Sequence, residues 1–361
     1  MTTLESQLDY PFGDTLPAPG APLQVAPGVY WLRMGLPFAL NHINLWLLED
    51  EIDTDGSSVK GWTIIDCGIA DDATRASWEV VFANHLRGLP VLQVIATHCH
   101  PDHVGLADWL CRRWQAPLLM SAGEYAFARM MAAAMPGIDG ASMFPHFRQH
   151  GLGDHGMEAQ LEGRRSYYPA LVPAVPHAFR RLQDGQALTI GGRTWRVITG
   201  FGHSPEHVAL SCADDGLLIS GDMVLPRIST NVSVFAIEPE SNPVQLYVDS
   251  LGKYAHLAAD TLVLPSHGKP FRGLHARIGQ LCDHHAARLE EVLDACSEPR
   301  SAADIVPIMF RRPLDAHQLS FALGEALAHL HQLWLSRRVR RLQHADGVFR
   351  FQRTEAATDN L

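Results

Sequence analysis

Residues 97–103 read Thr-His-Cys-His-Pro-Asp-His, and no other part of the chain gathers so many potential metal ligands. His98 and His100 are two residues apart, so an extended backbone projects both imidazoles to the same side. The proline that follows turns the chain and delivers Asp102 and His103 to a different point in space. Three neutral imidazoles and a carboxylate this close together have no evident partner except a cation. The stretch therefore predicts a metal site with ligands for two ions.

The same kind of position recurs along the chain, where a β-type run ends and a metal-competent side chain follows. Residues 91–96 are apolar except for Gln93 and indicate a buried strand that ends at the histidine-rich stretch. Open sheets place their sites at such carboxyl ends of strands. Three later runs end in the same way, at His203, Asp222 and His267. These positions fit one sheet edge that is lined with ligands.

Composition sets the broad class. The chain has 361 residues, of which 47% are hydrophobic and 19% charged, so we expect one large domain and a smaller one. We find no apolar run of about 18 residues and no N-terminal signal pattern, which predicts a cytoplasmic protein without a membrane partner. The six cysteines occur singly, so a disulfide framework is not indicated. The net charge of -10 argues against a surface that binds nucleic acid throughout.

The chain before the C-terminal region has three parts. Residues 1–22 hold several Pro and Gly and are predicted to be a flexible arm, followed by a catalytic domain at 23–272 in which 49–58 is a polar loop. Residues 136–178 are irregular, with five prolines, and are predicted to be an insertion that acts as a lid. We interpret its four histidines (146, 150, 155 and 177) as part of a solvated loop. Its candidates for substrate binding are Arg164, Arg165, Tyr167 and Tyr168.

Residues 273–361 are predicted to form a separate helical domain. Apolar residues recur at helical spacing over 278–296 and again over 319–334. Ser301 and Asp304 match a capping box for a short helix that Pro307 would end. Six arginines then follow between 337 and 353, around Gly347, in what we interpret as a basic hairpin.

Four motifs together carry a resemblance to a known family. They are Thr-His-x-His-x-Asp-His at 97–103, Gly-His-Ser-Pro-x-His at 202–207, Gly-Asp at 221–222 and Ser-His-Gly at 266–268. In this order they resemble the metallo-β-lactamase superfamily over about residues 25–270. The resemblance implies an α+β fold, the αββα sandwich, with a two-metal site at one edge. The helix, helix, hairpin order after residue 300 resembles the winged-helix-like C-terminal domain of the beta-lactamase-like protein 2 branch.

The resemblance also implies roles for single residues. The ligands implied for the first metal are His98, His100 and His203, and those for the second are Asp102, His103 and His267. Asp222 would bridge the two metals. Asp66, in Ile-Ile-Asp-Cys-Gly, matches the family's first motif and would support the metal loop from behind the ligands. His207 lies where family members keep a structural histidine, so it is not counted as a ligand.

The ligand set implies a hydrolase. Imidazole and carboxylate suit two zinc ions per chain, although manganese or iron would also be held. A hydroxide between the metals would attack the carbonyl of a small ester, thioester or lactone, and Asp102 would relay a proton to the leaving group.

Other activities stay open. Asp222 as a bridge resembles the glyoxalase II, lactonase and ribonuclease branches more than the true β-lactamases, so a metal-dependent endoribonuclease is one alternative. The Thr-His-Cys-His spelling also occurs in the persulfide dioxygenase branch, which uses a single iron. We expect a small-molecule partner first and nucleic acid second, and a homo-oligomer is compatible with the sequence.

Overall fold

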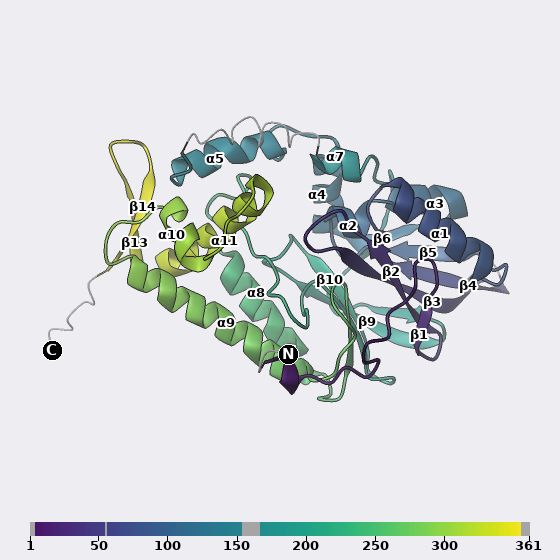
Figure 1. Cartoon of the computed structure of the whole chain (residues 1–361). Coiled ribbons are helices and arrows are strands. Elements are labelled where there is room, and N and C mark those ends of the chain that lie inside the picture. The colour runs from purple at the N-terminus through teal and green to yellow at the C-terminus, as the bar shows by residue number, and fades with distance from the viewer. Residues whose placement is uncertain (1–3, 55, 154–166, 355–361) are drawn as a thin grey trace. The chain divides into compact units, whose positions relative to one another are not determined.

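The computed structural model describes residues 4–54, 56–153 and 167–354, which fall into two compact units (Figure 1). Unit 1 holds the described residues up to 134 together with 168–230 and 250–278. Unit 2 holds the described residues of 135–167, 231–249 and 279–361. The sequence predicts two continuous domains, whereas these units are interleaved along the chain.

Unit 1 is built on a seven-stranded sheet whose strands lie in chain order. Its strands are β1 (Leu23–Ala26), β2 (Val29–Gly35), β3 (His42–Thr54), β4 (Ser57–Ile65), β5 (Val91–Ile95), β6 (Leu118–Ser121) and β7 (Arg180–Leu182). The first four strands pair antiparallel, and β4 to β7 pair parallel. The parallel part points the carboxyl ends of β4, β5 and β6 to one edge, where the sequence predicts the site.

A second sheet of five strands has the order β12-β11-β10-β9-β8. Its strands are β8 (Ala187–Ile190), β9 (Arg193–Gly200), β10 (His207–Cys212), β11 (Leu217–Gly221) and β12 (Leu262–Pro265). Ile190 pairs with Arg193, so Gly191 and Gly192 form the two-residue turn, and both have positive φ. Strands β9, β11 and β12 run in the same direction, so their carboxyl ends also share an edge.

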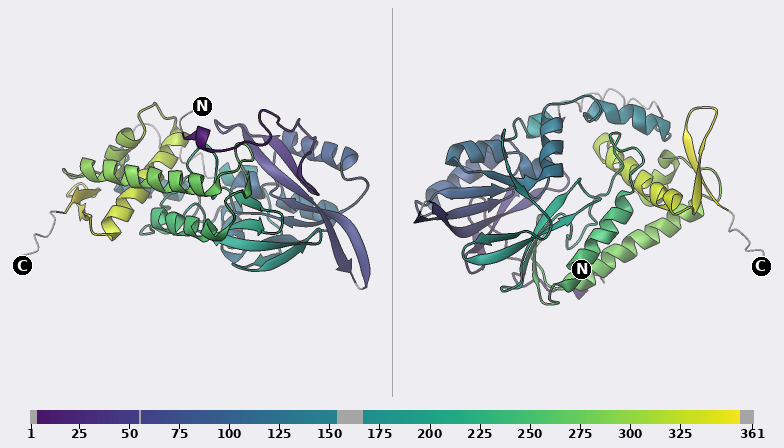
Figure 2. Two further views of the ribbon diagram at one scale, coloured as in Figure 1. Left: turned by 90° about the horizontal axis from the view of Figure 1, so that it is seen from below. Right: turned by 180° about the vertical axis from the view of Figure 1, so that it is seen from behind.

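Two apolar cores hold these layers together. One contains Trp31 and Trp46 from the first sheet with Trp195 and Leu264 from the second, so the sheets pack face to face (Figure 2). The other lies between the seven-stranded sheet and the helices α1 (Asp72–Asn84), α2 (Pro101–Val104), α3 (Ala107–Trp114) and α4 (Ala122–Ala132). The 3₁₀ helix η4 (Lys253–His256) is attached to strand β9 of the second sheet, because Lys253 Nζ donates hydrogen bonds to the carbonyl and hydroxyl oxygens of Thr199. The predicted α+β sandwich is confirmed.

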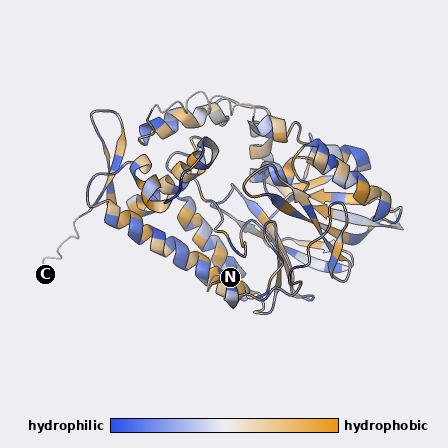
Figure 3. Ribbon diagram, viewed as in Figure 1, coloured by the Kyte–Doolittle hydropathy of each residue, from blue (hydrophilic) through white to orange (hydrophobic). Residues whose placement is uncertain are grey.

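Unit 2 is mainly helical. Its elements are η2 (Gly140–Ser142), α5 (Met143–Gln149), α10 (Ala302–Met309), α11 (Ala316–Leu335) and the hairpin of β13 (Val339–Gln343) and β14 (Phe349–Arg353), and it shares α8 (Pro243–Gly252) and α9 (Leu274–Ala295) with unit 1. Hydrophobic and hydrophilic patches recur along helix α9 (Figure 3), as expected for a helix with one apolar and one polar face. Ser301 and Asp304 form the predicted capping box, but the helix continues two residues past Pro307.

Three local predictions differ from the structure. The described residues of 49–58 belong mostly to two long paired strands and not to a polar loop, because β3 and β4 stay paired as far as Thr54 and Ser57. Part of the expected N-terminal arm is held in place, since Asp9 pairs with Arg272 and Leu8 is buried. The expected insertion contains α5 and α7 (Tyr167–Leu171), and its residues 154–166 lie outside the described part of the chain.

None of the helices in the described ranges is both long and apolar enough to cross a membrane.

Candidate metal centre

Strand ends bring seven candidate ligands together within unit 1. The histidine-rich stretch follows β5 and enters α2, so His98 and His100 lie before the helix and the other two ligands lie in its first turn. His203 follows β9, Asp222 follows β11 and His267 follows β12. The ligands therefore come from four strand ends of two sheets, whereas the strand pattern in the sequence predicts a single sheet edge.

A first group contains His98, His100, His203 and Asp222, with ligand atoms all within 4.8 Å of one another. His98 Nε2 lies 2.9 Å from His100 Nδ1 and 3.2 Å from His203 Nε2. Ligand nitrogens around a tetrahedral zinc ion, at bonds of 2.0–2.1 Å, are roughly 3.3 Å apart. The spacing of the three ring nitrogens thus suits three ligands of one ion.

A second group contains Asp102, His103 and His267, again within 4.8 Å. Asp102 Oδ2 lies 3.4 Å from His267 Nε2 and 3.7 Å from His103 Nε2. Asp222 stands between the groups, because its Oδ2 is 3.4 Å from His203 Nε2 while its Oδ1 is 3.5 Å from His267 Nε2. One carboxylate therefore presents one oxygen to each group.

Hydrogen bonds outside the site orient the imidazoles. His103 Nδ1 lies 2.8 Å from Asp66 Oδ2, and His267 Nδ1 lies 2.8 Å from the carbonyl oxygen of His42. Since these oxygens accept, each Nδ1 carries the hydrogen and each Nε2 faces the site. Within the described ranges, His103 Nε2 and Asp222 Oδ1 are buried without a hydrogen-bond partner. Buried polar atoms normally have partners, so this donor set fits a bound cation.

Electrostatics divide the site into two different halves. Burial, together with the neighbouring imidazoles, holds the pKa of His98 and of His100 well below the ordinary value, which leaves neutral lone pairs. Burial also disfavours the protonated form of His103. The nearby carboxylates of Asp66, Asp102 and Asp222 outweigh burial and raise the pKa of His103 to about 10. The histidines of the first group therefore offer neutral nitrogens, and the carboxylates around His103 concentrate negative charge that attracts a cation.

Asp66 and His207 support the ligands without joining them. Asp66 is fully buried at a φ of 64° and accepts hydrogen bonds from the backbone and hydroxyl of Thr97 as well as from His103. His207 Nε2 accepts from the backbone N–H of Asp222 at 3.1 Å, so that nitrogen is not free to bind a metal. Gly221 has a φ of 53°, and a Cβ there would lie 2.3 Å from His207 Nε2. Only glycine lets the two approach this closely.

The expected substrate residues have different outcomes. Tyr168 is predicted to contact the substrate, but the structure does not support this role. Its side chain is buried, and its hydroxyl donates a hydrogen bond to the carbonyl oxygen of Cys99, between His98 and His100. Arg164 and Arg165 lie outside the described residues. Tyr167 begins α7 and is partly exposed, and its role stays a prediction.

Two further residues near the ligands are not singled out by the sequence. His42 Nε2 accepts from the backbone N–H of Gly268 at 2.9 Å, and its ring meets that of His267 edge to face. Glu124 is fully buried and hydrogen-bonded to both loops that carry the histidines of the first ligand group. The sequence signal for Glu124 is ambiguous, because Ser121-x-x-Glu124 also matches a capping box.

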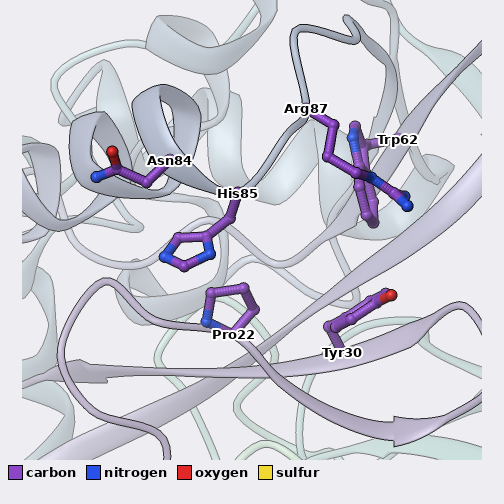
Figure 4. A pocket seen from close by; sticks show the side chains of 6 residues that line it. All are labelled: Pro22, Tyr30, Trp62, Asn84, His85 and Arg87. Atoms are coloured by element: carbon purple, nitrogen blue, oxygen red, sulfur yellow. The ribbon is translucent and has the colours of Figure 1, made fainter.

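A separate depression of about 260 Å³ lies elsewhere in unit 1 (Figure 4). Arg87 lies over the ring of Trp62 there and pairs with Glu49. It contains none of the seven candidate ligands, and its lining residues are Pro22, Tyr30, Trp62, Asn84, His85 and Arg87. This depression is therefore distinct from the metal centre.

Comparison with known families identifies the fold. Residues 43–267 match the model of the metallo-beta-lactamase superfamily. The chain belongs to the metallo-beta-lactamase superfamily. Residues 289–354 match a second model, described as the metallo-beta-lactamase-like C-terminal domain.

Solved structures and curated relatives agree with this membership. A beta-lactamase domain protein from Burkholderia ambifaria is 60% identical, covers 98% of this chain and all of its own, and superposes with a TM-score of 0.91. A metallo-beta-lactamase family protein from Thermus thermophilus is 28% identical, with 92% of this chain and all of its own covered and a TM-score of 0.74. The probable metallo-hydrolase YqjP of Bacillus subtilis is 25% identical over 84% of this chain and 91% of its own. The chain is therefore a superfamily metallo-hydrolase with a His/Asp cluster suited to metal.

Proposed function

We propose that this protein is a hydrolase that uses two metal ions, one in each ligand group, to act on a small ester, thioester or lactone. The observation that carries the proposal is the position of Asp222, whose two carboxylate oxygens face different groups at 3.4 and 3.5 Å. A site for a single ion would need only one of these groups, and the seven side chains exceed the four ligands of a closed structural zinc site. The mixture of imidazole and carboxylate favours zinc, with manganese or iron as other ions that the same ligands accept.

A pair of such ions, when bound, lowers the pKa of a coordinated water to roughly 7 and neutralises negative charge that develops on a reacting oxygen. The chain's own residues prepare this chemistry. Asp66 and the His42 carbonyl set the tautomers of His103 and His267, so both direct Nε2 inward. Asp102 is the more exposed of the two carboxylates in the site, with 18% of its side chain accessible against 10% for Asp222. It is therefore the residue that we propose to carry a proton toward the leaving group.

The C-terminal hairpin favours a small substrate over RNA. Four of its arginines pair with acids of the same unit: Arg338 with Glu290, Arg341 with Glu240, Arg350 with Asp346 and Arg353 with Asp294. Arg341 also lies 3.9 Å above the ring of Trp334. Arginines engaged in this way hold the hairpin within its unit and are less available to phosphates. We therefore propose a packing role for the basic hairpin.

The test is metal analysis of the purified protein followed by a substrate panel of thioesters, lactones, β-lactams and single-stranded RNA. We expect close to two metals per chain and hydrolysis of an ester-type substrate. Asp222→Ala should lose most of both, whereas Asp50→Ala, which removes a buried carboxylate of the sheet, should keep the metal. One tightly held iron per chain with oxygen uptake on a persulfide would support the dioxygenase alternative. Cleavage of RNA alone would support the ribonuclease.

A further inference from the structure

Glu124 is a buried carboxylate that joins the two loops carrying the three histidines of the first ligand group. It lies in the first turn of α4, behind the N-cap Ser121, and is fully buried. Its Oε2 accepts from the backbone N–H of Cys99 at 2.8 Å, between His98 and His100. Its Oε1 accepts from the hydroxyl of Ser204 at 2.6 Å, directly after His203.

The carboxylate form matches these bonds. The backbone N–H of Glu206 also donates to Oε1, at 2.6 Å, so three donors converge on the two oxygens. A neutral carboxylic acid would place a hydrogen on one oxygen and lose an acceptor there. In an ordinary capping box the glutamate returns to the N-cap backbone, whereas this one reaches across to two other loops. Its arrangement thus serves the loops more than its own helix.

Neighbouring groups restrain the same loops from other sides. The carbonyl oxygen of Cys99 accepts from the Tyr168 hydroxyl, so this residue is held at both its N–H and its C=O. Ser121 Oγ donates to the carbonyl oxygen of Glu206 at 2.7 Å. With the loops held in this way, His98 Nε2 and His203 Nε2 lie 3.2 Å apart although they are separated by 105 residues.

We propose that Glu124 is a positioning residue that sets the distance between the His98/His100 loop and the His203 loop, and so the geometry and affinity of the first metal position. The inference rests on the proposed two-metal function. Without the carboxylate, the three donors would lose a common acceptor and the two loops could separate. Groups that orient metal ligands from behind typically change metal affinity by about 10- to 100-fold when removed.

The experiment compares Glu124→Gln with a matched control, Asp50→Asn. Asp50 is also a buried carboxylate in unit 1 and accepts from Thr63 Oγ1 at 2.6 Å and from the Gly191 N–H at 2.9 Å, but it contacts neither ligand loop. Both changes convert a buried acceptor into an amide, so both should lower the melting temperature. Zinc affinity is measured by chelator competition, and the visible spectrum is recorded after loading with Co²⁺.

We expect Glu124→Gln to weaken the first zinc position about 10- to 100-fold and to shift the Co²⁺ bands, because the ligand geometry changes. Asp50→Asn should keep the wild-type spectrum and an affinity within about threefold of wild type, despite its lower stability. Wild-type affinity and spectrum in Glu124→Gln would overturn the inference and leave the proposed function intact. A wild-type protein that binds no zinc or cobalt would overturn both.

If Glu124→Gln does not fold, Ser204→Ala provides the second test. It removes one of the three hydrogen bonds from the loop side and leaves helix α4 unchanged. A smaller loss of zinc affinity, with a Co²⁺ shift relative to wild type, would support the inference. An unchanged spectrum and affinity in Ser204→Ala would count against it.

Discussion

Acidification from pH 8 to pH 5.5 should destabilise unit 2, because among its described residues this unit buries five histidines in the neutral form. They are His146, His150, His285, His329 and His331. Burial, with help from neighbouring imidazoles and cations, lowers the pKa to about 4 for three of them and to about 3 for His150 and His285. In the unfolded chain each would titrate near its ordinary value of 6.5.

The sign follows from where protons bind. Below pH 6.5 these histidines bind protons in the unfolded chain, whereas in the folded unit they stay neutral until pH 3 to 4. The free energy of unfolding therefore falls as the pH falls through this window. At pH 5.5 each histidine favours unfolding by ~1.4 kcal/mol, which gives ~7 kcal/mol for the set. Glu325 has the opposite effect. Burial raises its pKa to about 7, so its protonation in the folded unit stabilises the folded state by ~2 kcal/mol at pH 5.5. The net loss of ~5 kcal/mol is comparable with the whole stability of many domains.

Trp334 gives a signal specific to unit 2. It is the single tryptophan of that unit, and the other seven belong to unit 1. Protein labelled with 5-fluorotryptophan would be titrated with urea at pH 8, 7, 6 and 5.5, and the ¹⁹F resonance of Trp334 identified from Trp334→Phe. We expect its unfolding midpoint to fall steadily below pH 7.

His150→Phe separates titration from packing. The His150 ring lies 5.5 Å from the ring of Phe349, so phenylalanine suits the site and removes one titrating group. Its pH dependence should be smaller by ~1.4 kcal/mol over this range, whereas His344→Gln in the β13–β14 turn serves as the control. A Trp334 midpoint that is equal at pH 8 and pH 5.5, or a full pH dependence in His150→Phe, would refute the reasoning.

Three further outcomes are expected. Asp66→Asn should weaken metal binding about 10- to 100-fold, as measured by chelator competition, while the protein stays folded. The reason is that an amide cannot accept hydrogen bonds from both His103 and Thr97 as the carboxylate does. Unchanged binding would count against a supporting role. Gly221→Ala should lower the free energy of unfolding by more than ~2 kcal/mol in urea titration, since its Cβ would collide with His207; a change below ~0.5 kcal/mol would contradict the observed approach. Arg338→Gln should change the hydrolysis rate of the best small substrate less than about twofold, because it removes an exposed ion pair with Glu290; loss of activity in a folded variant would show that the hairpin takes part in catalysis.

The ligand edge could be predicted because its signals are local. A β-type run followed by a ligand is visible in sequence at His98, His203 and His267, and strand direction then brings these ends together. The hairpin at Gly191 and Gly192 could be predicted for the same reason, since the turn chemistry lies in adjacent residues.

The predictions that failed depend on contacts distant in sequence. Polar residues between 49 and 58 suggest a loop, yet Asp50 is buried there and accepts hydrogen bonds from Thr63 and Gly191. The sequence suggests a solvated loop around His146 and His150, but both are buried in unit 2, where His150 packs beside Phe349. The neighbouring Phe144 and Phe147 are buried as well, but Phe349, which packs beside His150, comes from the far end of the chain.

The interleaving of the two units limits how this architecture can be rearranged. The described residues of 135–167, together with residues 231–249, belong to a unit whose remainder starts at residue 279. A cut at residue 279 would therefore divide unit 2, because two of its segments lie earlier in the chain. We expect the lengths of those two segments to vary together with the presence of the C-terminal domain among relatives.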